Sequence, residues 1–257
     1  MRLMRLIGLR RLIPKAIRAR LRGRWNKLLQ FEQHLEERRF YRQFVKRGDL
    51  VFDIGANKGA KAMALLSLGA RVVAVEPNPA CTKAILDENR KAVAKGSLQV
   101  ECAAVAAQAG EMTLTIFDSE ADMTSGSAEF LNYARTVGYT DTRSVTARAT
   151  TLDNLIEQFG LPAFLKIDVE GMDADALRGL SSKPSYLSFE YNTAGTLLEN
   201  TRECFRQAVR LGFTEANLTE ATAPKLVFES WVRTDTALAQ LEKWHLTGDR
   251  WGDVVLR

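Results

Sequence analysis

The sequence predicts an α/β protein with a doubly wound, mostly parallel sheet. Short apolar stretches alternate with amphipathic stretches of helical period along most of the 257 residues, which is typical of parallel sheets flanked by helices. A glycine-containing turn follows the first apolar stretch, at 50–54. No apolar run reaches the roughly twenty residues that a membrane-spanning helix needs, and a chain of this length can bury a substantial core.

The composition is that of an ordinary globular protein, with 46% hydrophobic and 26% charged residues. The cysteines, Cys81, Cys102 and Cys204, are far apart and form no CxxC pair. This spacing argues against a zinc site or a disulfide framework and favours a reducing compartment. We therefore expect a cytoplasmic protein, and we assign no metal ligands.

The net charge of +5 is unevenly distributed. Residues 1–27 contain ten Arg or Lys and no acid, so the rest of the chain is net acidic. We predict a basic N-terminal arm, residues 1–30, followed by one domain, residues 31–257. Because the positive charge lies on the arm, we do not expect specific nucleic-acid binding.

The arm has the pattern of an amphipathic helix. Ile17, Leu21, Trp25 and Leu28 recur at helical spacing among arginines. Such a helix can contact an anionic membrane surface, here through residues 1–29, or can pack against the domain. A cleavable targeting peptide is less favoured because the arm lacks serine.

The first half of the domain follows the strand–helix alternation. Gly69 is a helix stop, and Pro79 suits a first helical turn. A continuous apolar stretch at 71–75 is typical of a buried parallel strand. The expected elements are a helix covering the sheet at 31–45, a strand at 50–54, a helix at 57–68, a strand at 71–75, a helix at 79–94 and a strand at 98–102.

Residues 103–150 interrupt this alternation. An alternating strand at 111–117 could pair with 145–149 as an antiparallel edge. Residues 118–142 are rich in Ser, Thr, Gly and Asp without a clear period, which predicts a functional or mobile loop. The alternation then resumes, with helices expected at 152–159, 171–180 and 197–211 and strands at 164–169, 186–190, 213–218, 225–232 and 253–256.

The turn after the first strand is the first candidate binding feature. In α/β sheets a nucleotide-like ligand lies outside the carboxyl end of such a strand. Gly55 and Gly59 do not have the GxGxxG spacing, and no GK[ST] follows, so a pyrophosphate is a poor candidate. A ligand with a ribose and an amino-acid tail fits better, with Asp53 and the turn holding the tail. The alternative is that both glycines only make a turn.

Two further groups of acids follow strands. Glu76 ends the second strand and can accept hydrogen bonds from both ribose hydroxyls, or can be an ordinary exposed acid before a proline. Asp168 and Glu170 should share one face at the end of a later strand, with Glu190 ending the next. Such carboxylates can transfer protons, hold hydroxyls or bind a divalent cation, or Lys166 can pair with one in a structural cluster.

The two histidines are weaker candidates. His34 lies among charged residues and should be exposed. His245 could act as a general base, but a lone histidine is more often structural.

Taken together, these motifs resemble one known family. The segments 52–59 (FDIGANKG), 76–79 (EPNP), 151–153 (TLD) and 165–171 (LKIDVEG) resemble the FkbM family of S-adenosyl-L-methionine-dependent methyltransferases in order and spacing, over about residues 44–207. The resemblance implies the class I methyltransferase fold, a Rossmann-like seven-stranded sheet with an antiparallel final hairpin. The strands expected at 213–218 and 251–256 fit that hairpin.

The resemblance also implies roles for individual residues. Aspartate stands at Asp173, where the family often has glutamate, and residues 118–142 match no family pattern. The implied cofactor-binding residues are Asp53, Gly55, Asn57 and Gly59 at the methionine portion, Glu76 at the ribose, Cys102, Ala103 and Ala104 at the adenine, and Asp168 at the sulfonium, with Glu170 and Glu190 bordering the acceptor.

Family resemblance favours methylation of a hydroxyl on a sugar, glycan or natural product, although nitrogen acceptors also occur. Asp168 or Glu170 would then remove the hydroxyl proton. Two alternative functions also stay open from the sequence. A nicotinamide-dependent oxidoreductase is disfavoured by the missing GxGxxG, and a non-catalytic, membrane-associated binding module would keep the fold without turnover.

Overall fold

The computed structural model describes residues 31–117, 123–220 and 223–257. The predicted arm, residues 1–30, and its membrane contact lie outside this part of the chain. Within the described residues, no helix is both long enough and apolar enough to cross a bilayer.

The main sheet confirms the predicted fold class. Its strand order is β3-β2-β1-β8-β9-β13-β10, and two short strands, β11 and β12, extend it beside β10. The strands from β3 to β9 are parallel, whereas β13 is antiparallel to both of its neighbours. The strands are β1 (Leu50–Ile54), β2 (Arg71–Val75), β3 (Leu98–Glu101), β8 (Phe164–Ile167), β9 (Tyr186–Asn192), β10 (Glu215–Glu220), β11 (Ala223–Leu226), β12 (Val232–Arg233) and β13 (Trp251–Leu256).

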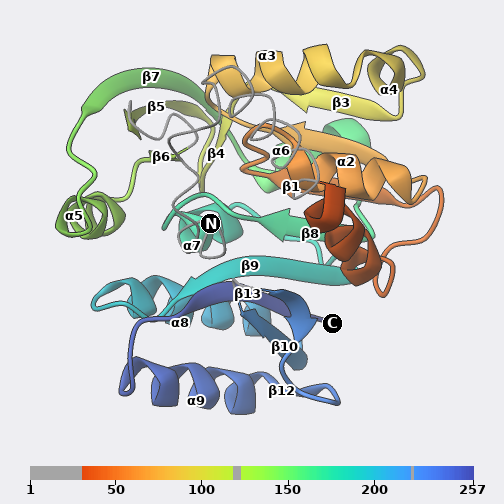
Figure 1. Cartoon of the computed structure of the whole chain (residues 1–257). Helices are drawn as coiled ribbons and strands as arrows, with labels where there is room; N and C mark the ends of the chain where they lie inside the picture. Colours follow the sequence, from red (N-terminus) through yellow and green to blue (C-terminus); the bar gives the residue numbers. More distant parts are fainter. Residues whose placement is uncertain (1–30, 118–122, 221–222) are drawn as a thin grey trace, which may run out of the picture.

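Helices cover both faces of this sheet (Figure 1). Phe52 and Ile54 pack on one face with the apolar sides of four helices, whereas Val51 faces the opposite layer, which includes the helical residues 31–41. Alternate residues of each parallel strand therefore enter different cores. The first layer contains α6 (Leu152–Phe159), α7 (Asp173–Arg178), α8 (Leu197–Arg210) and α9 (Thr234–His245), and the second contains α2 (Ala60–Ser67) and α3 (Pro79–Glu88).

Local capping explains several helix boundaries. The Asn78 side chain accepts a hydrogen bond from the Ala80 amide, and Pro79 occupies the first turn of α3. The single helix predicted over 79–94 is interrupted at Asn89, so that α4 (Arg90–Ala94) is separate. The Asn89 side-chain amide donates to the Ile85 carbonyl (2.9 Å), the kind of side-chain competition that interrupts helices.

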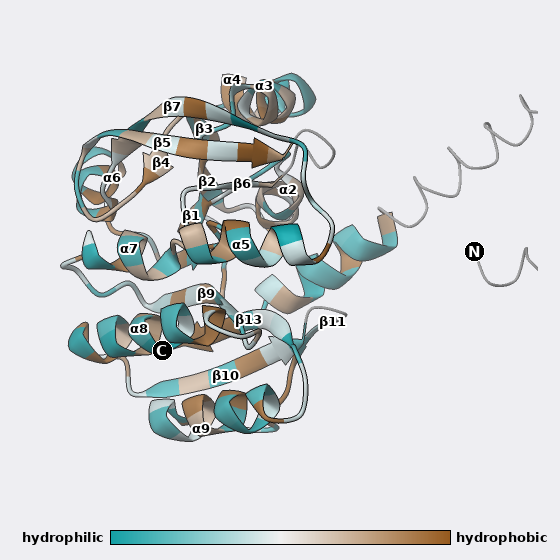
Figure 2. Cartoon of the chain, turned by 90° about the vertical axis from the view of Figure 1, so that its left-hand side faces the viewer, coloured by the Kyte–Doolittle hydropathy of each residue, from teal (hydrophilic) through white to brown (hydrophobic). Residues whose placement is uncertain are grey.

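The final antiparallel strands are confirmed as β10 and β13, but no tight turn joins them. Helix α9 lies between them in the chain and was not predicted. It buries Ala237, Leu241 and Trp244 along one side, and Figure 2 shows hydrophilic and hydrophobic turns on α8 and α9. Three apolar positions spaced over two turns are a weak periodic signal in a single sequence.

A second, four-stranded sheet stands beside the main one (Figure 1). The predicted pairing of 111–117 with 145–149 is confirmed by β5 (Gly110–Phe117) and β7 (Thr142–Thr150), which β4 (Ala104–Val105) and β6 (Thr124–Ser125) complete. The prediction of a patternless loop was wrong for residues 123–142. They include β6 and α5 (Ala128–Thr136), which buries only Phe130 and Ala134.

Candidate functional site

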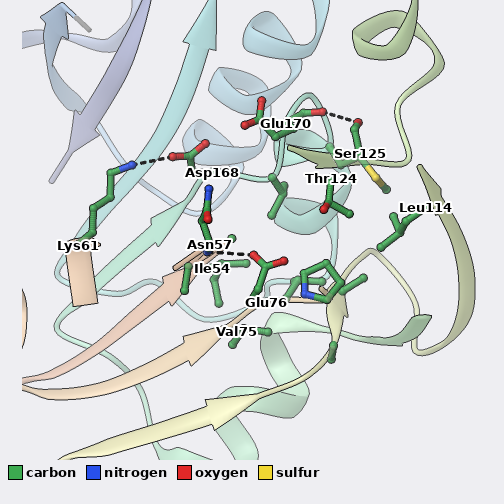
Figure 3. A pocket seen from close by; sticks show the side chains of 18 of the residues that line it. Ile54, Asn57, Lys61, Val75, Glu76, Leu114, Thr124, Ser125, Asp168 and Glu170 are labelled. Atoms are coloured by element: carbon green, nitrogen blue, oxygen red, sulfur yellow. Dashed lines mark hydrogen bonds and ion pairs between the residues drawn. The ribbon is translucent and has the colours of Figure 1, made fainter. Parts of the chain in front are cut away.

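A cavity of about 370 Å³ opens at the carboxyl ends of β1, β2 and β8 (Figure 3). Its floor is the turn after β1, and β5 and β6 of the second sheet form its opposite wall. Its lining residues include Gly55, Asn57, Lys61, Glu76, Ala103, Ala104, Met112, Leu114, Ser125, Asp168 and Glu170.

The turn after β1 is held against both neighbouring strands. The Gly55 and Ala56 amides donate to the Val75 carbonyl at 2.9 and 3.1 Å. Gly55 has φ +77°, and a Cβ there would lie 1.7 Å from the Asp168 carbonyl oxygen. Asn57 also lies in the left-handed region, at φ +49°, which asparagine tolerates better than most residues. Gly55 is thus required by close backbone packing as well as by conformation.

Glu76 lies where the ribose of a nucleoside would be expected. The side chain is 5% exposed, and its two oxygens accept hydrogen bonds from the Asn57 amide (3.0 Å) and the Asn78 amide (2.8 Å). Burial raises its pKa to about 7, although the two amides oppose this shift. Each oxygen keeps a lone pair for a ligand hydroxyl.

Three residues predicted to bind the cofactor do not line this cavity. Asp53 is fully buried, and neither of its oxygens accepts a hydrogen bond from a described residue. Burial raises its pKa, against the opposing charges of Lys166 and Lys61. Gly59 is the N-cap of α2, with φ +83°. Cys102 is exposed, with its sulfur 3.9 Å from the Pro77 carbonyl oxygen, whereas Ala103 and Ala104 do line the cavity.

Strand register explains why charged residues gather here. Asp53 pairs with Lys166, and Lys166 pairs with Ser188, so these side chains share one face of the sheet. Glu190 lies on the same face of β9 and pairs with Asp253 of β13. Asp253 was not predicted, because its position depends on the pairing of strands distant in sequence.

Asp168 is clamped by two lysines. One of its oxygens, Oδ2, lies 2.9 Å from Lys61 Nζ and 2.8 Å from Lys166 Nζ. Burial opposes ionisation of Asp168, but the two lysines outweigh it and hold its pKa well below the ordinary value. The sequence alternative of a Lys166 pair is therefore confirmed. A carboxylate held so strongly ionised is a weak proton acceptor.

Glu170 has the opposite character. Strand β8 ends at Ile167, so Glu170 lies beyond the strand. Its position therefore does not follow from the predicted alternation of side chains along a strand. It lies in a turn with φ +52°, where Ser125 Oγ donates to its carbonyl oxygen (2.7 Å; Figure 3). Burial, and then the charge of Asp168, raises the Glu170 pKa to about 8. Asp168 and Glu170 still line the same cavity, as the sequence predicted.

A second cavity, of about 390 Å³, adjoins the first. Lys61 and Asp168 line both cavities and so lie at their junction. Glu190 lines this second cavity rather than the first, together with Asp253. Burial, followed by the charge of Asp168, raises the Glu190 pKa well above its ordinary value.

Sequence reasoning missed several lining residues. Lys61 comes from α2, Tyr41 from the helical residues 31–41 and Ser125 from the second sheet, and none belongs to a motif. Neither histidine lines either cavity. The Nδ1 atom of His245 lies 2.7 Å from the Thr193 carbonyl oxygen, which is a structural contact.

The sheet, in which the antiparallel strand β13 lies between β9 and β10, and the cavity at its carboxyl edge define a class I methyltransferase-like fold. The model of the methyltransferase FkbM domain matches residues 53–207, more than half of the chain. The chain therefore belongs to the FkbM family of S-adenosyl-L-methionine-dependent methyltransferases. No curated protein matches the sequence.

Solved structures of methyltransferases are similar at low identity. A TehB-like methyltransferase from Corynebacterium glutamicum has 11% identity and a TM-score of 0.46, over 95% of this chain and 98% of that one. A geranyl diphosphate methyltransferase in complex with S-adenosylmethionine has 11% identity and a TM-score of 0.47, over 95% and 90%. Fibrillarin from Aeropyrum pernix, with natively bound S-adenosylmethionine, has 12% identity and a TM-score of 0.41, over 83% and 68%.

The acids whose pKa is raised predict that the stability of the protein depends on pH. The pKa rises from 4.5 to about 7 for Glu76 and to about 8 for Glu170, and from 3.8 to about 7 for Asp173. At pH values between the ordinary and the raised pKa of each acid, the folded protein holds a proton that the unfolded chain has released. Stability therefore falls as pH rises through this range. We expect the free energy of unfolding without cofactor to drop by at least about 1.4 kcal/mol, equivalent to one pKa unit, between about pH 5 and about pH 8.

Urea denaturation across this range measures the effect. The depressed pKa of Asp168 contributes stability that is lost only at pH values below its ordinary 3.8, outside the tested window. Constant or rising stability would contradict the prediction.

Proposed function

We propose that this protein transfers a methyl group from S-adenosyl-L-methionine to a hydroxyl oxygen of a small-molecule or glycan acceptor, such as a sugar or natural product. The observation that carries the proposal is the second cavity, which adjoins the cofactor cavity at Lys61 and Asp168 and is lined by carboxylates. Carboxylates can orient hydroxyl groups as hydrogen-bond acceptors and can take up a proton.

The residues of the first cavity fit the cofactor. The Glu76 carboxylate, oriented by two backbone amides, would receive the ribose hydroxyls. Ala103 and Ala104, with Met112 and Leu114 opposite, offer an apolar slot for the adenine. The Gly55 turn would hold the methionine portion, and the buried, unpaired Asp53 would favour its cationic amine from beneath the turn.

The bound cofactor supplies an electrophilic methyl group, so the protein has to align the acceptor and accept a proton. Of the two predicted carboxylates Glu170 is the stronger base, because its pKa is raised whereas that of Asp168 is lowered, and it lines the cofactor cavity beside Asp168. Asp168, which two lysines hold ionised, lies at the junction between the cavities and fixes the position of Lys61 there. Calorimetric titration with S-adenosylhomocysteine, followed by mass spectrometry of hydroxylated acceptors incubated with cofactor, tests the proposal. A folded protein that binds no S-adenosylhomocysteine would refute it.

Replacing Glu76 tests the assignment of the ribose site. Glu76→Gln should weaken S-adenosylhomocysteine binding by roughly 10- to 100-fold, the usual loss for a hydrogen bond to a charged group. Glu101→Gln is the matched control, since Glu101 ends the neighbouring β3 but pairs with Arg148 (2.9 Å) outside the cavity. Equal affinities of the two variants in calorimetry would remove Glu76 from the site.

One of the two rivals is now less favoured. Membership of a methyltransferase family argues against the nicotinamide-dependent oxidoreductase, in line with the missing GxGxxG. A binding module without turnover would bind S-adenosylhomocysteine but methylate no acceptor. Peripheral membrane contact through residues 1–29 stays a prediction.

A further inference from the structure

More acids line the second cavity than basic residues are there to pair with them. Lys61 is the only Lys or Arg among its lining residues in the described part of the chain, and it is already paired with Asp168. Glu220 is paired with Arg250 (2.7 Å). The acids that line the cavity are Glu36, Glu37, Asp168, Glu190, Glu220 and Asp253.

Two of these acids lie side by side without a partner. Glu190 and Asp253 are directly opposite in the antiparallel pairing of β9 and β13, and neither carboxylate bonds to any residue that the structure describes. Like charges in this arrangement are destabilising. Burial, as the largest cause, raises the pKa of both acids. The pair therefore favours a positive charge between its members.

Two aromatic side chains also point to a ligand. Tyr41 is 3% exposed as a residue and lines the cavity, and its hydroxyl makes no hydrogen bond within the described residues. This hydroxyl is therefore available to donate a hydrogen bond to a ligand in the cavity. Trp251 lines the same cavity and is 52% exposed, and its ring face can attract a cation.

From these contacts we infer that the acceptor is a small hydroxylated amine, with amino sugars as the simplest class. The inference rests on the proposed function and names its substrate class. The protonated amine lies between Glu190 and Asp253, and Tyr41 donates a hydrogen bond to an oxygen of the same molecule. A cavity of about 390 Å³ suits a small organic molecule better than a bare ion.

Ligand-observed NMR on the full-length protein saturated with S-adenosylhomocysteine tests the inference. The probes are glucosamine, glucose and glucuronate, which differ in charge but share a sugar ring. We expect glucosamine to bind at least about tenfold more tightly than glucose, and glucuronate to bind most weakly. Glu190→Gln and Asp253→Asn should each weaken glucosamine binding by about tenfold or more. Glu215→Gln, which alters an acid paired with Arg257 (2.9 Å) away from both cavities, should leave it unchanged.

Several outcomes would overturn the inference: absence of glucosamine binding, equal binding of the three sugars, or unchanged binding in the Gln and Asn variants. Both variants should stay folded, because removing one of two like charges that lie opposite each other should keep or raise the melting temperature. The calorimetric titration with S-adenosylhomocysteine separates the proposed function from the inference about the acceptor. Without S-adenosylhomocysteine binding the proposed function fails, whereas cofactor binding without amine selectivity overturns the inference alone.

Discussion

Asp168→Ala should lower the free energy of unfolding by about 3–5 kcal/mol, the cost of leaving a buried charge uncompensated. Lys166 is fully buried, and Asp168, 2.8 Å away, is the only hydrogen-bond or ion-pair partner of its ammonium group among the described residues. The variant should also lose methyl transfer, because Lys61 loses its partner at the junction of the two cavities. Urea denaturation and a methyl-transfer assay measure the two effects.

The double variant Lys166→Met/Asp168→Leu separates stability from activity. Removing both charges replaces the buried pair by apolar side chains, which is often neutral or stabilising. We expect its stability to lie close to that of the wild type while methyl transfer stays absent. If the free energy of unfolding of Asp168→Ala lies within about 1 kcal/mol of the wild-type value, the contacts of Asp168 with the two lysines are not structurally important.

Gly55→Ala should abolish cofactor binding and destabilise the protein by more than about 3 kcal/mol, in the range of severe backbone and packing defects. The added Cβ would lie 1.7 Å from the Asp168 carbonyl oxygen, so the turn and the end of β8 cannot both keep their positions. Calorimetry with S-adenosylhomocysteine and thermal denaturation report binding and stability.

Gly96→Ala is the matched control for conformation. Gly96 also has a positive φ, +70°, but a Cβ there meets nothing within 4 Å. It should cost only about 1 kcal/mol, the ordinary penalty for alanine in the left-handed region, and should leave binding intact. Similar losses in both variants would show that conformation, rather than the contact with Asp168, requires glycine at position 55.

The sequence alone predicted the parallel part of the sheet and several residues of the first cavity. The alternation of apolar and amphipathic stretches records which residues face a core, so it predicted the parallel strands and most helices. Gly55 and Glu76 lie within a few residues of the strand ends that position them, and that local relation is visible in one chain. Asp53, Gly59 and Cys102, which were also predicted to bind the cofactor, do not line the cavity.

Most of the second cavity was decided by tertiary structure, although the sequence did single out Glu190. Asp253 stands opposite Glu190 because β13 pairs antiparallel with β9, and no local pattern specifies that register. Tyr41 and Lys61 reach the second cavity from helices whose packing on the sheet depends on distant residues. The sequence thus determined the fold class and the cofactor turn, because strand–helix periodicity and glycine conformation are local properties. The charge and shape of the second cavity arise only when strand register and helix packing bring distant side chains together.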